Sequence, residues 1–253
     1  MSLTLVLMNS PHVSFSQGSA ANLQIVLRFV HFVAGITWVG LLYFFNLVNI
    51  PFMQKMDPST RSKVVPVLMP GALWWFRWAS VVTVLAGIRY WMMIVSSDVH
   101  NAQTVLGIAQ ASGGAAIGTF FTIWTVAFVI EMGMLMSPAE GLRNGWVLGI
   151  VVGITVTAAS YLYLALNSHG WESGRLLSIG IGGGLGWFML LNVWGIIWRI
   201  QKKLIRWTIE GSMPPEAAKL ARLSLLTTRI NFVLTFPMLF FMAAASHYPM
   251  FGR

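Results

Sequence analysis

At 253 residues the chain is long enough for one or two water-soluble domains, but its composition excludes that class. Hydrophobic residues make up 57% and charged residues only 9%, and the sixteen Lys and Arg are bunched between long apolar stretches. This pattern is typical of an all-α, polytopic membrane protein whose main partner is the lipid bilayer. The net charge of +9 therefore indicates orientation in the membrane and not nucleic-acid binding. The absence of cysteine excludes disulfides, thiolate metal sites and covalently attached haem.

Six segments contain about 20 mainly apolar residues each, the length that crosses the hydrocarbon core of a bilayer. Pro51 is expected to end the first segment and the Pro70-Gly71 pair to precede the second, because proline breaks helical hydrogen bonding. The predicted organisation is an N-terminal segment at 1–27 and a six-helix membrane domain at 28–250, with a basic segment at about 199–225. The predicted spans are 28–49, 73–95, 113–136, 145–166, 178–198 and 226–246.

Basic residues predict the orientation of these spans. Eleven Lys and Arg fall on one side of the predicted helices, whereas only Arg175 and Arg253 fall on the other. Cytoplasmic loops carry the excess of positive charge, so the sequence predicts a multi-pass membrane protein with both termini outside. The eleven residues are Lys55, Arg61, Lys63, Arg143, Arg199, Lys202, Lys203, Arg206, Lys219, Arg222 and Arg229.

The first span carries polar residues that are costly in hydrocarbon. Arg28, His31, Gly35 and Trp38 follow the spacing of three and four residues that places side chains on one face of a helix. With the N-terminus outside, this face lies in the outer leaflet. The sixth span brings His247 to the same leaflet, and the second span brings Arg89.

Two histidines and two arginines in one leaflet fit a b-type haem. Neutral imidazoles of His31 and His247 would bind the iron axially, and Arg28 and Arg89 would pair with the propionates. Gly35 would leave room for the macrocycle, and Trp38 would line it. The alternative is that each histidine is a hydrogen-bonded structural residue.

Other outer residues extend this hypothesis. His100 and His169, in outer loops, are alternatives to His247 as second ligand. The loop 167–175, which contains His169, Glu172 and Arg175, is predicted to be part of a docking surface if electrons or substrate arrive from outside.

The inner half of the predicted bundle contains a second pair of charges. Arg77 and Glu131 lie at similar depths, so an ion pair of Glu131 with Arg77 or with Arg143 is expected, and a proton relay is the alternative. Glycines recur every fourth residue, which predicts close helix packing, with a flat cofactor against the fifth span as the alternative. These glycines are Gly114, Gly118, Gly145, Gly149, Gly153, Gly180, Gly182, Gly184 and Gly186.

Four motifs carry a family resemblance: RFVHFVAGITWVG, WWFRWASVVTVLAGI, LLNVWGIIWRIQKK and RINFVLTFPMLFFMAAASHYP. Their order resembles the urate oxidase N-terminal membrane-domain family, the membrane portion of bacterial cytochrome-c-linked urate oxidases, over about residues 24–250. Members that oxidise urate carry a C-terminal cytochrome c domain. This sequence ends at Arg253 without cysteine, so the resemblance implies a separate cytochrome c. The matched positions are His31, Trp38, Arg77, Asn192, Asn231 and His247.

Three functions follow from these observations. The first is an integral membrane redox protein that binds haem b and exchanges electrons with an extracytoplasmic cytochrome c or a respiratory or photosynthetic complex. The second is a cofactor-free structural subunit of a membrane complex. The third is a urate-oxidising membrane enzyme.

Overall fold

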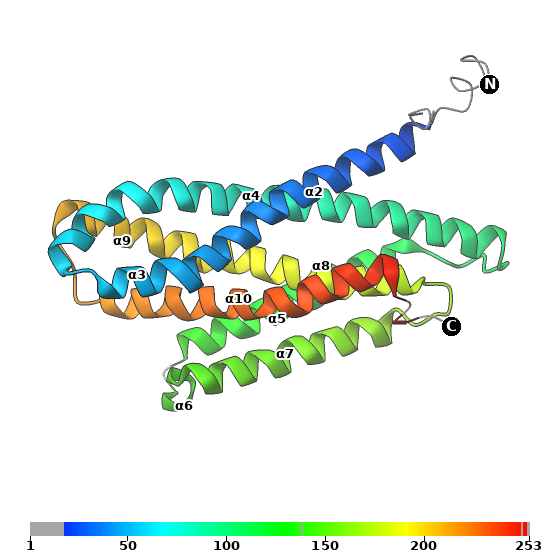
Figure 1. Ribbon diagram of the computed structural model, residues 1–253. Helices are drawn as coiled ribbons and strands as arrows, with labels where there is room; N and C mark the ends of the chain where they lie inside the picture. Colours follow the sequence, from blue (N-terminus) through cyan, green and yellow to red (C-terminus); the bar gives the residue numbers. More distant parts are fainter. Residues whose placement is uncertain (1–17, 138, 249, 252–253) are drawn as a thin grey trace, which may run out of the picture.

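The computed structural model describes residues 18–137, 139–248 and 250–251, and only the backbone of Glu140 and Arg143. All the regular structure in these residues is helical (Figure 1). The elements in chain order are α2 (Ser19–Tyr43), η1 (Phe44–Asn49), α3 (Ile50–Lys55), α4 (Pro58–Thr104), α5 (Gly113–Met136), α6 (Glu140–Arg143), α7 (Gly145–Leu166), α8 (Gly174–Asn192), η2 (Val193–Ile197), α9 (Trp198–Glu210) and α10 (Ala217–His247).

Six helical rods in these residues are long and apolar enough to cross a membrane, as the sequence predicts for a multi-pass membrane protein. α5 and α7 have the predicted bounds. Two rods are composite, because π-helical turns join α2 to α3 and α8 to α9 without a break. The rods are Ser19–Lys55, Pro58–Thr104, Gly113–Met136, Gly145–Leu166, Gly174–Glu210 and Ala217–His247.

The two ends of the bundle differ in their residues (Figure 1). We call one the histidine end: it holds the start of α2, the connections at 104–113 and 166–174, and the end of α10 at His247. The other is the basic end, which holds the connections at 55–58, 136–145 and 210–217.

Prolines do not mark the helix ends as predicted. Pro51 lies in the first turn of α3, where a missing N–H is tolerated, and the rod continues to Lys55. α4 runs for 47 residues through Pro66 and Pro70, and it begins where Asp57 accepts hydrogen bonds from the N–H groups of Ser59 and Thr60. α2 begins at Ser19, before the predicted start of the first span at residue 28, and residues 1–17 of the predicted N-terminal segment lie outside the described part.

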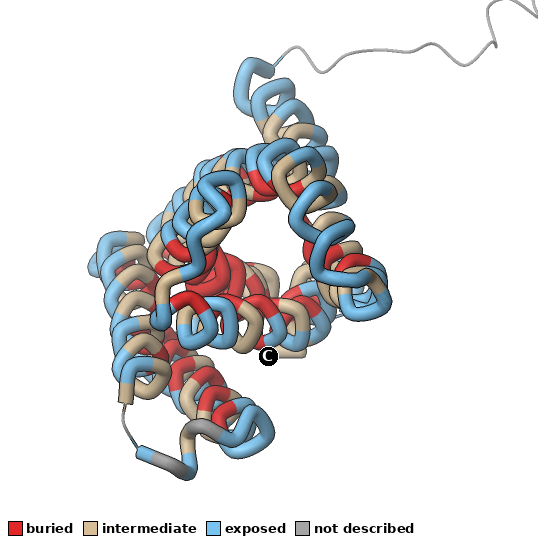
Figure 2. Tube along the Cα trace, turned by 90° about the vertical axis from the view of Figure 1, so that its left-hand side faces the viewer, coloured by how far each residue is buried: buried red, intermediate tan, exposed pale blue. Residues whose placement is uncertain are grey.

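α8 lies at the centre of the bundle. In its rod, 78% of the most apolar 18-residue window is buried, compared with 11% for the rod that begins with α2. α8 packs against α10, α5 and α4, whereas α2 packs mainly on α4 at the periphery (Figure 2). The buried side chains of α4, α5, α7, α8 and α10 together form one continuous core.

Glycines explain how close the helices approach α8. A methyl group at Gly180 would overlap the ring of Tyr163 on α7, and one at Gly184 would overlap the indole of Trp124 on α5. Gly182 faces α10, where a methyl would lie 3.1 Å from the carbonyl oxygen of Met238. Side chains thus fill both glycine faces of α8, so the alternative of a flat cofactor there is wrong.

The predicted glycine contact of the fourth span is not observed. Methyl groups at Gly149 and Gly153 on α7 would meet nothing within 4 Å, and the same holds for Gly118 on α5. Only Gly145 of that α7 series approaches a neighbour, at 3.2 Å from Leu226. The spacing is the same as on α8, but this face of α7 points away from the bundle.

Candidate functional site

His31 is fixed between α2 and α4. Its Nδ1 lies 2.8 Å from the carbonyl oxygen of Thr83, and only an N–H can pair with a carbonyl, so Nδ1 carries the proton. In a neutral ring Nε2 then keeps its lone pair and is able to bind a metal. A histidine held by a backbone carbonyl through one nitrogen is the usual arrangement when the other nitrogen is a metal ligand.

A glycine of α4 makes room for this ring. A methyl group at Gly87 would lie 2.9 Å from both Nδ1 and Cε1 of His31, closer than atoms of this kind approach. Gly35, which was expected to leave space for a cofactor, instead faces Thr83, at 3.6 Å from its methyl group. Gly87 and Thr83 therefore position His31, and Gly35 allows α2 and α4 to touch.

Two arginines converge on Tyr90, one turn further along α4. The guanidinium of Arg28 lies 6.0 Å and that of Arg175 5.5 Å from the centre of the Tyr90 ring, and Arg175 donates a hydrogen bond to the Tyr90 hydroxyl. The Nε of Arg175 is buried and has no hydrogen-bond partner in the described part of the chain. Neither arginine forms an ion pair with a carboxylate among the described residues, and two such cations from α2 and α8 favour an anionic ligand.

The other predicted ligands of this cluster are arranged differently. Arg89 is exposed on α4, so Arg175 lies where Arg89 was expected. The physical reason is that Arg89 and Tyr90 are successive residues about 100° apart on the helix, and Tyr90 occupies the face toward Arg28. Trp38 of α2 is buried in the core, and its Nε1 has no partner within the described residues.

His247 is the last residue of α10 and is exposed. α2 and α10 touch where the hydroxyl of Thr235 lies 3.1 Å from that of Tyr43. His31 and His247 are each twelve residues from this contact toward the histidine end, about 18 Å at 1.5 Å per residue. The two helices diverge from this contact toward the histidine end (Figure 1).

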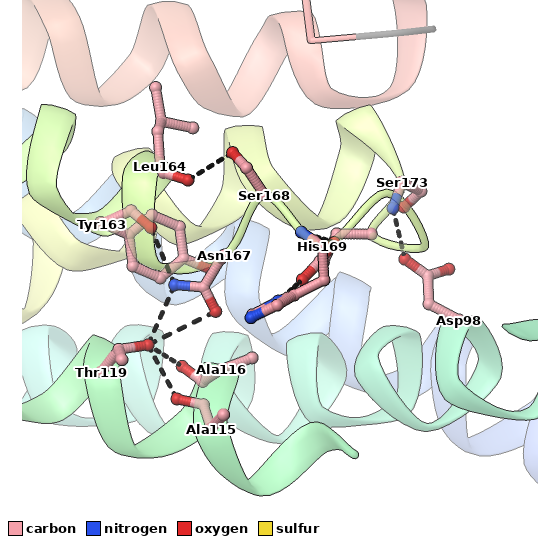
Figure 3. A network of polar contacts seen from close by, with 11 residues as sticks. Asp98, Ala115, Ala116, Thr119, Tyr163, Leu164, Asn167, Ser168, His169 and Ser173 are labelled. Carbon is pink, nitrogen blue, oxygen red and sulfur yellow. Dashed lines mark hydrogen bonds and ion pairs between the residues drawn. The ribbon is translucent and has the colours of Figure 1, made fainter. Parts of the chain in front are cut away.

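The loop 167–175 is anchored by polar contacts (Figure 3). Asn167 donates to Thr119 on α5 and to the carbonyl of Tyr163, and the N–H of Ser173 donates to Asp98 on α4. His169 pairs with Glu172 at 2.6 Å while remaining exposed. The loop is thus an ordered surface at the histidine end.

The predicted pairing of Arg77 with Glu131 is wrong. The Arg77 guanidinium stacks on three tryptophans, at 4.0 Å from Trp198, 5.2 Å from Trp78 and 5.3 Å from Trp194. The faces of these rings are electron-rich and compensate for the cation in place of a carboxylate. The alternative partner Arg143 has a side chain outside the described part.

Glu131 belongs to a buried polar group with Asn192 and Asn231. The Nδ2 of Asn192 lies 2.9 Å from Oδ1 of Asn231, and both residues are fully buried. Glu131 is also fully buried beside Asn192, yet neither of its oxygens has a hydrogen-bond partner in the described chain. The π-helical turn η2 begins directly after Asn192, and such turns are frequent at functional sites.

The sequence therefore indicates part of the candidate site but not the residues that support it. The sequence alone does not assign the supporting residues, because they act through contacts between α2, α4 and α8; they are Thr83, Gly87, Tyr90 and Arg175. One signal for them is present in the sequence: Thr83, Gly87 and Tyr90 are spaced by four and three residues, which places them on one face of a helix. Among the described residues no group of three His, Asp or Glu gathers that could hold a bare metal ion.

Comparison with known proteins places the chain in a family. The model of the family described as urate oxidase N-terminal matches residues 58–252. The chain belongs to the urate oxidase N-terminal family. No curated protein and no solved structure matches it.

The match covers α4 to the end of α10 and so contains Arg77, Asn192, Asn231 and His247. α2, with His31 and Trp38, precedes the matched region. For this member of the urate oxidase N-terminal family, the assignment of His31 thus depends on its geometry and not on the family match.

Proposed function

We propose that this chain is an integral membrane redox protein that binds a b-type haem at its histidine end. The observation that carries the proposal is the fixed His31 ring, whose Nδ1 is bound to Thr83 so that Nε2 is available. The chemistry of the described residues suits the group: His31 would supply a nitrogen ligand, and Arg28 and Arg175 would supply cations for the propionates. When bound, haem supplies one-electron redox chemistry.

We propose the basic end as the cytoplasmic side, since the basic residues of the connecting segments gather there. The haem site then lies in the outer half of an inner-membrane protein. The ordered loop 167–175 lies at this end, where it would form part of the surface that contacts a cytochrome c or a larger respiratory or photosynthetic complex. His247, at the end of α10 in the same half of the bundle, is the proposed second axial ligand.

The test is a dithionite-reduced minus oxidised absorption spectrum of the purified protein, with a pyridine haemochrome assay of haem type and amount. We expect a b-type spectrum with about one haem per chain. His31→Ala should abolish it, whereas His169→Ala should retain it, because His169 pairs with Glu172 at the surface. Full haem in a folded His31→Ala protein contradicts the proposal, and His247→Ala reports on the second ligand.

A cofactor-free structural subunit is the second candidate, and one observation favours it. The outward face of α2 exposes large apolar side chains, with Phe29 67% and Ile36 72% exposed, which a neighbouring membrane protein could cover. Absence of haem from the folded, purified protein would support this function. Urate oxidation by this chain is supported only by the name of the family. It would be tested by measuring urate turnover with cytochrome c as the electron acceptor.

A further inference from the structure

Glu131, in the basic half of the bundle, is a fully buried acid without a partner. Its residue exposure is 0%, and neither carboxyl oxygen has a hydrogen-bond partner among the described residues. An unpaired charge in such surroundings is very unfavourable, and a buried acid commonly avoids it by taking up a proton.

The neighbouring asparagines are oriented by a backbone carbonyl. Asn231 donates from Nδ2 to the carbonyl oxygen of Met189 at 3.0 Å, so its Oδ1 must face Asn192. Asn192 then donates from Nδ2 to that oxygen at 2.9 Å. The Oδ1 of Asn192 consequently points elsewhere, and it is buried without a donor in the described part of the chain.

This arrangement places the Glu131 carboxyl beside Asn192, whose Nδ2 donates to Asn231 and whose Oδ1 has no donor in the described part of the chain. The Asn192 side chain is close enough to the Glu131 carboxyl to interact with it, yet neither acid oxygen is hydrogen-bonded. An ionised carboxylate only accepts, whereas a protonated one has an O–H group that can donate to Oδ1 of Asn192. A proton on Glu131 therefore removes the buried charge and supplies a donor for Oδ1 of Asn192.

The charged groups of the surrounding helices do not replace that proton. Arg77 of α4 is held by tryptophans, and Arg229 of α10 is exposed. α7 carries no charged residue, and its only titratable side chains are Tyr161 and Tyr163. Two cations of α9, Arg199 and Lys202, line a groove beyond this end of α8.

The groove lies next to this region, and neither Glu131 nor Asn192 is part of its lining. Its volume is about 470 Å³, and its lining includes Phe128, Leu191 and Trp194 besides the two cations. Phe128 lies one helical turn from Glu131, and Leu191 is adjacent to Asn192. The Nε1 of Trp194 is buried and has no partner within the described residues, so it is a donor available to water.

We propose that Glu131 is a membrane-embedded proton-binding site that exchanges with water through this groove. The carboxylate takes a proton from hydronium, an O–H bond forms, one water is released, and the new O–H donates to Oδ1 of Asn192. This site is independent of the haem and goes beyond the redox function.

Infrared spectroscopy of the purified protein in an ester-free maltoside detergent tests the proposal. At neutral pH we expect the carbonyl stretch of a protonated carboxylic acid, shifted downward in D2O. Glu131→Gln should abolish this band and still fold, since the glutamine amide can donate to Asn192. The matched control is Glu210→Gln, which removes an exposed acid of α9 and should leave the band intact.

Two further variants examine the neighbours. Asn192→Ala should keep the band and move it to higher wavenumber, because the acid loses its acceptor. Leu191→Trp, which narrows the groove, should slow the D2O shift without removing the band. An equal rate would exclude the groove as the route.

The proposal would be overturned if the wild type showed no acid band at neutral pH. It would also be overturned if the band were unchanged in folded Glu131→Gln, or if it did not move in Asn192→Ala. Loss of the wild-type band when Na⁺ replaces K⁺ would also overturn it, because the three oxygens would then bind a metal ion.

Discussion

α8 and α2 are both apolar membrane-spanning helices, but the bundle uses them in opposite ways. α8 is surrounded by α4, α5, α7 and α10, and Gly180 and Gly184 let aromatic rings pack directly on its backbone. α2 contacts mainly α4 and exposes most of its apolar residues. Hydropathy does not distinguish the two helices, because lipid and protein interior are equally apolar environments.

The difference also concerns function. α8 carries Asn192 and Arg175 into its neighbours, so polar groups in the core are held by several helices. α2 carries its histidine on a single interface, where one hydrogen bond to Thr83 and the space above Gly87 hold the ring. Substitutions in α8 should therefore affect folding, and substitutions around His31 should affect the ligand.

The largest effect is expected for Gly184→Ala. The new methyl group would overlap the Trp124 indole, which is fully buried and cannot move aside, so we expect a loss of about 1–3 kcal/mol or more. The measurement is thermal unfolding in detergent. Gly153→Ala is the matched control, because open space surrounds that glycine and alanine favours the helix by about 0.5–1 kcal/mol. Equal melting of the two variants would contradict central packing by α8.

A smaller and more local effect is expected for Gly87→Ala. The methyl group would lie 2.9 Å from the His31 ring and would push it from its bond with Thr83. Haem content should fall several-fold while the melting temperature changes little, as measured by the pyridine haemochrome assay and thermal unfolding. Gly35→Ala is the control, since its methyl would be in ordinary contact at 3.6 Å. A normal haem content in Gly87→Ala would contradict this, because haem binding would then not depend on the position of the His31 ring.

The smallest effect is expected where α3 meets α4. Hydrogen bonds from the Thr60 and Ser59 side chains and from their backbone N–H groups hold the pKa of Asp57 well below its ordinary value of 3.8. A lowered acid pKa stabilises the fold fully above the ordinary value, and the contribution disappears as pH falls through the folded value. Asp57→Ala should therefore lower the melting temperature slightly at pH 7 and less as the pH falls below about 3.9. A difference between variant and wild type that grows in acid would contradict this.

The sequence predicts the number of spans and the bounds of α5 and α7, since Ser112 and Asn144 cap these helices and Ser137 and Asn167 end them. It does not predict the path through Pro51, Pro66 and Pro70. A proline in a long rod can be accommodated by neighbouring helices, and those neighbours are not visible in a local pattern.

The candidate site shows the same limit. The face of α2 that holds His31 and Trp38 follows from spacing alone. Arg175, and not Arg89, lies beside Tyr90 because of the side of α4 that meets α2 and α8. That side is set by tertiary packing and cannot be read from the local sequence. Arg77 is a case in which the expected partner is not the observed one. A cation within a membrane span suggests an ion pair with an acid, but three tryptophans from two rods surround its guanidinium.

The π-helical turn η2 makes the number of residues between Asn192 and Trp198 important for the arrangement of the buried polar group. Its hydrogen bond from the Trp198 N–H to the Val193 carbonyl spans five residues instead of four, so the turn holds one residue more than an α-helix would. If the same residues were wound as a regular α-helix, Trp198 and Arg199 would be rotated by about 100° relative to Asn192. The tryptophans that contact Arg77 and the asparagine pair would then no longer point to their present neighbours. The widened turn therefore sets the register between the two halves of this rod.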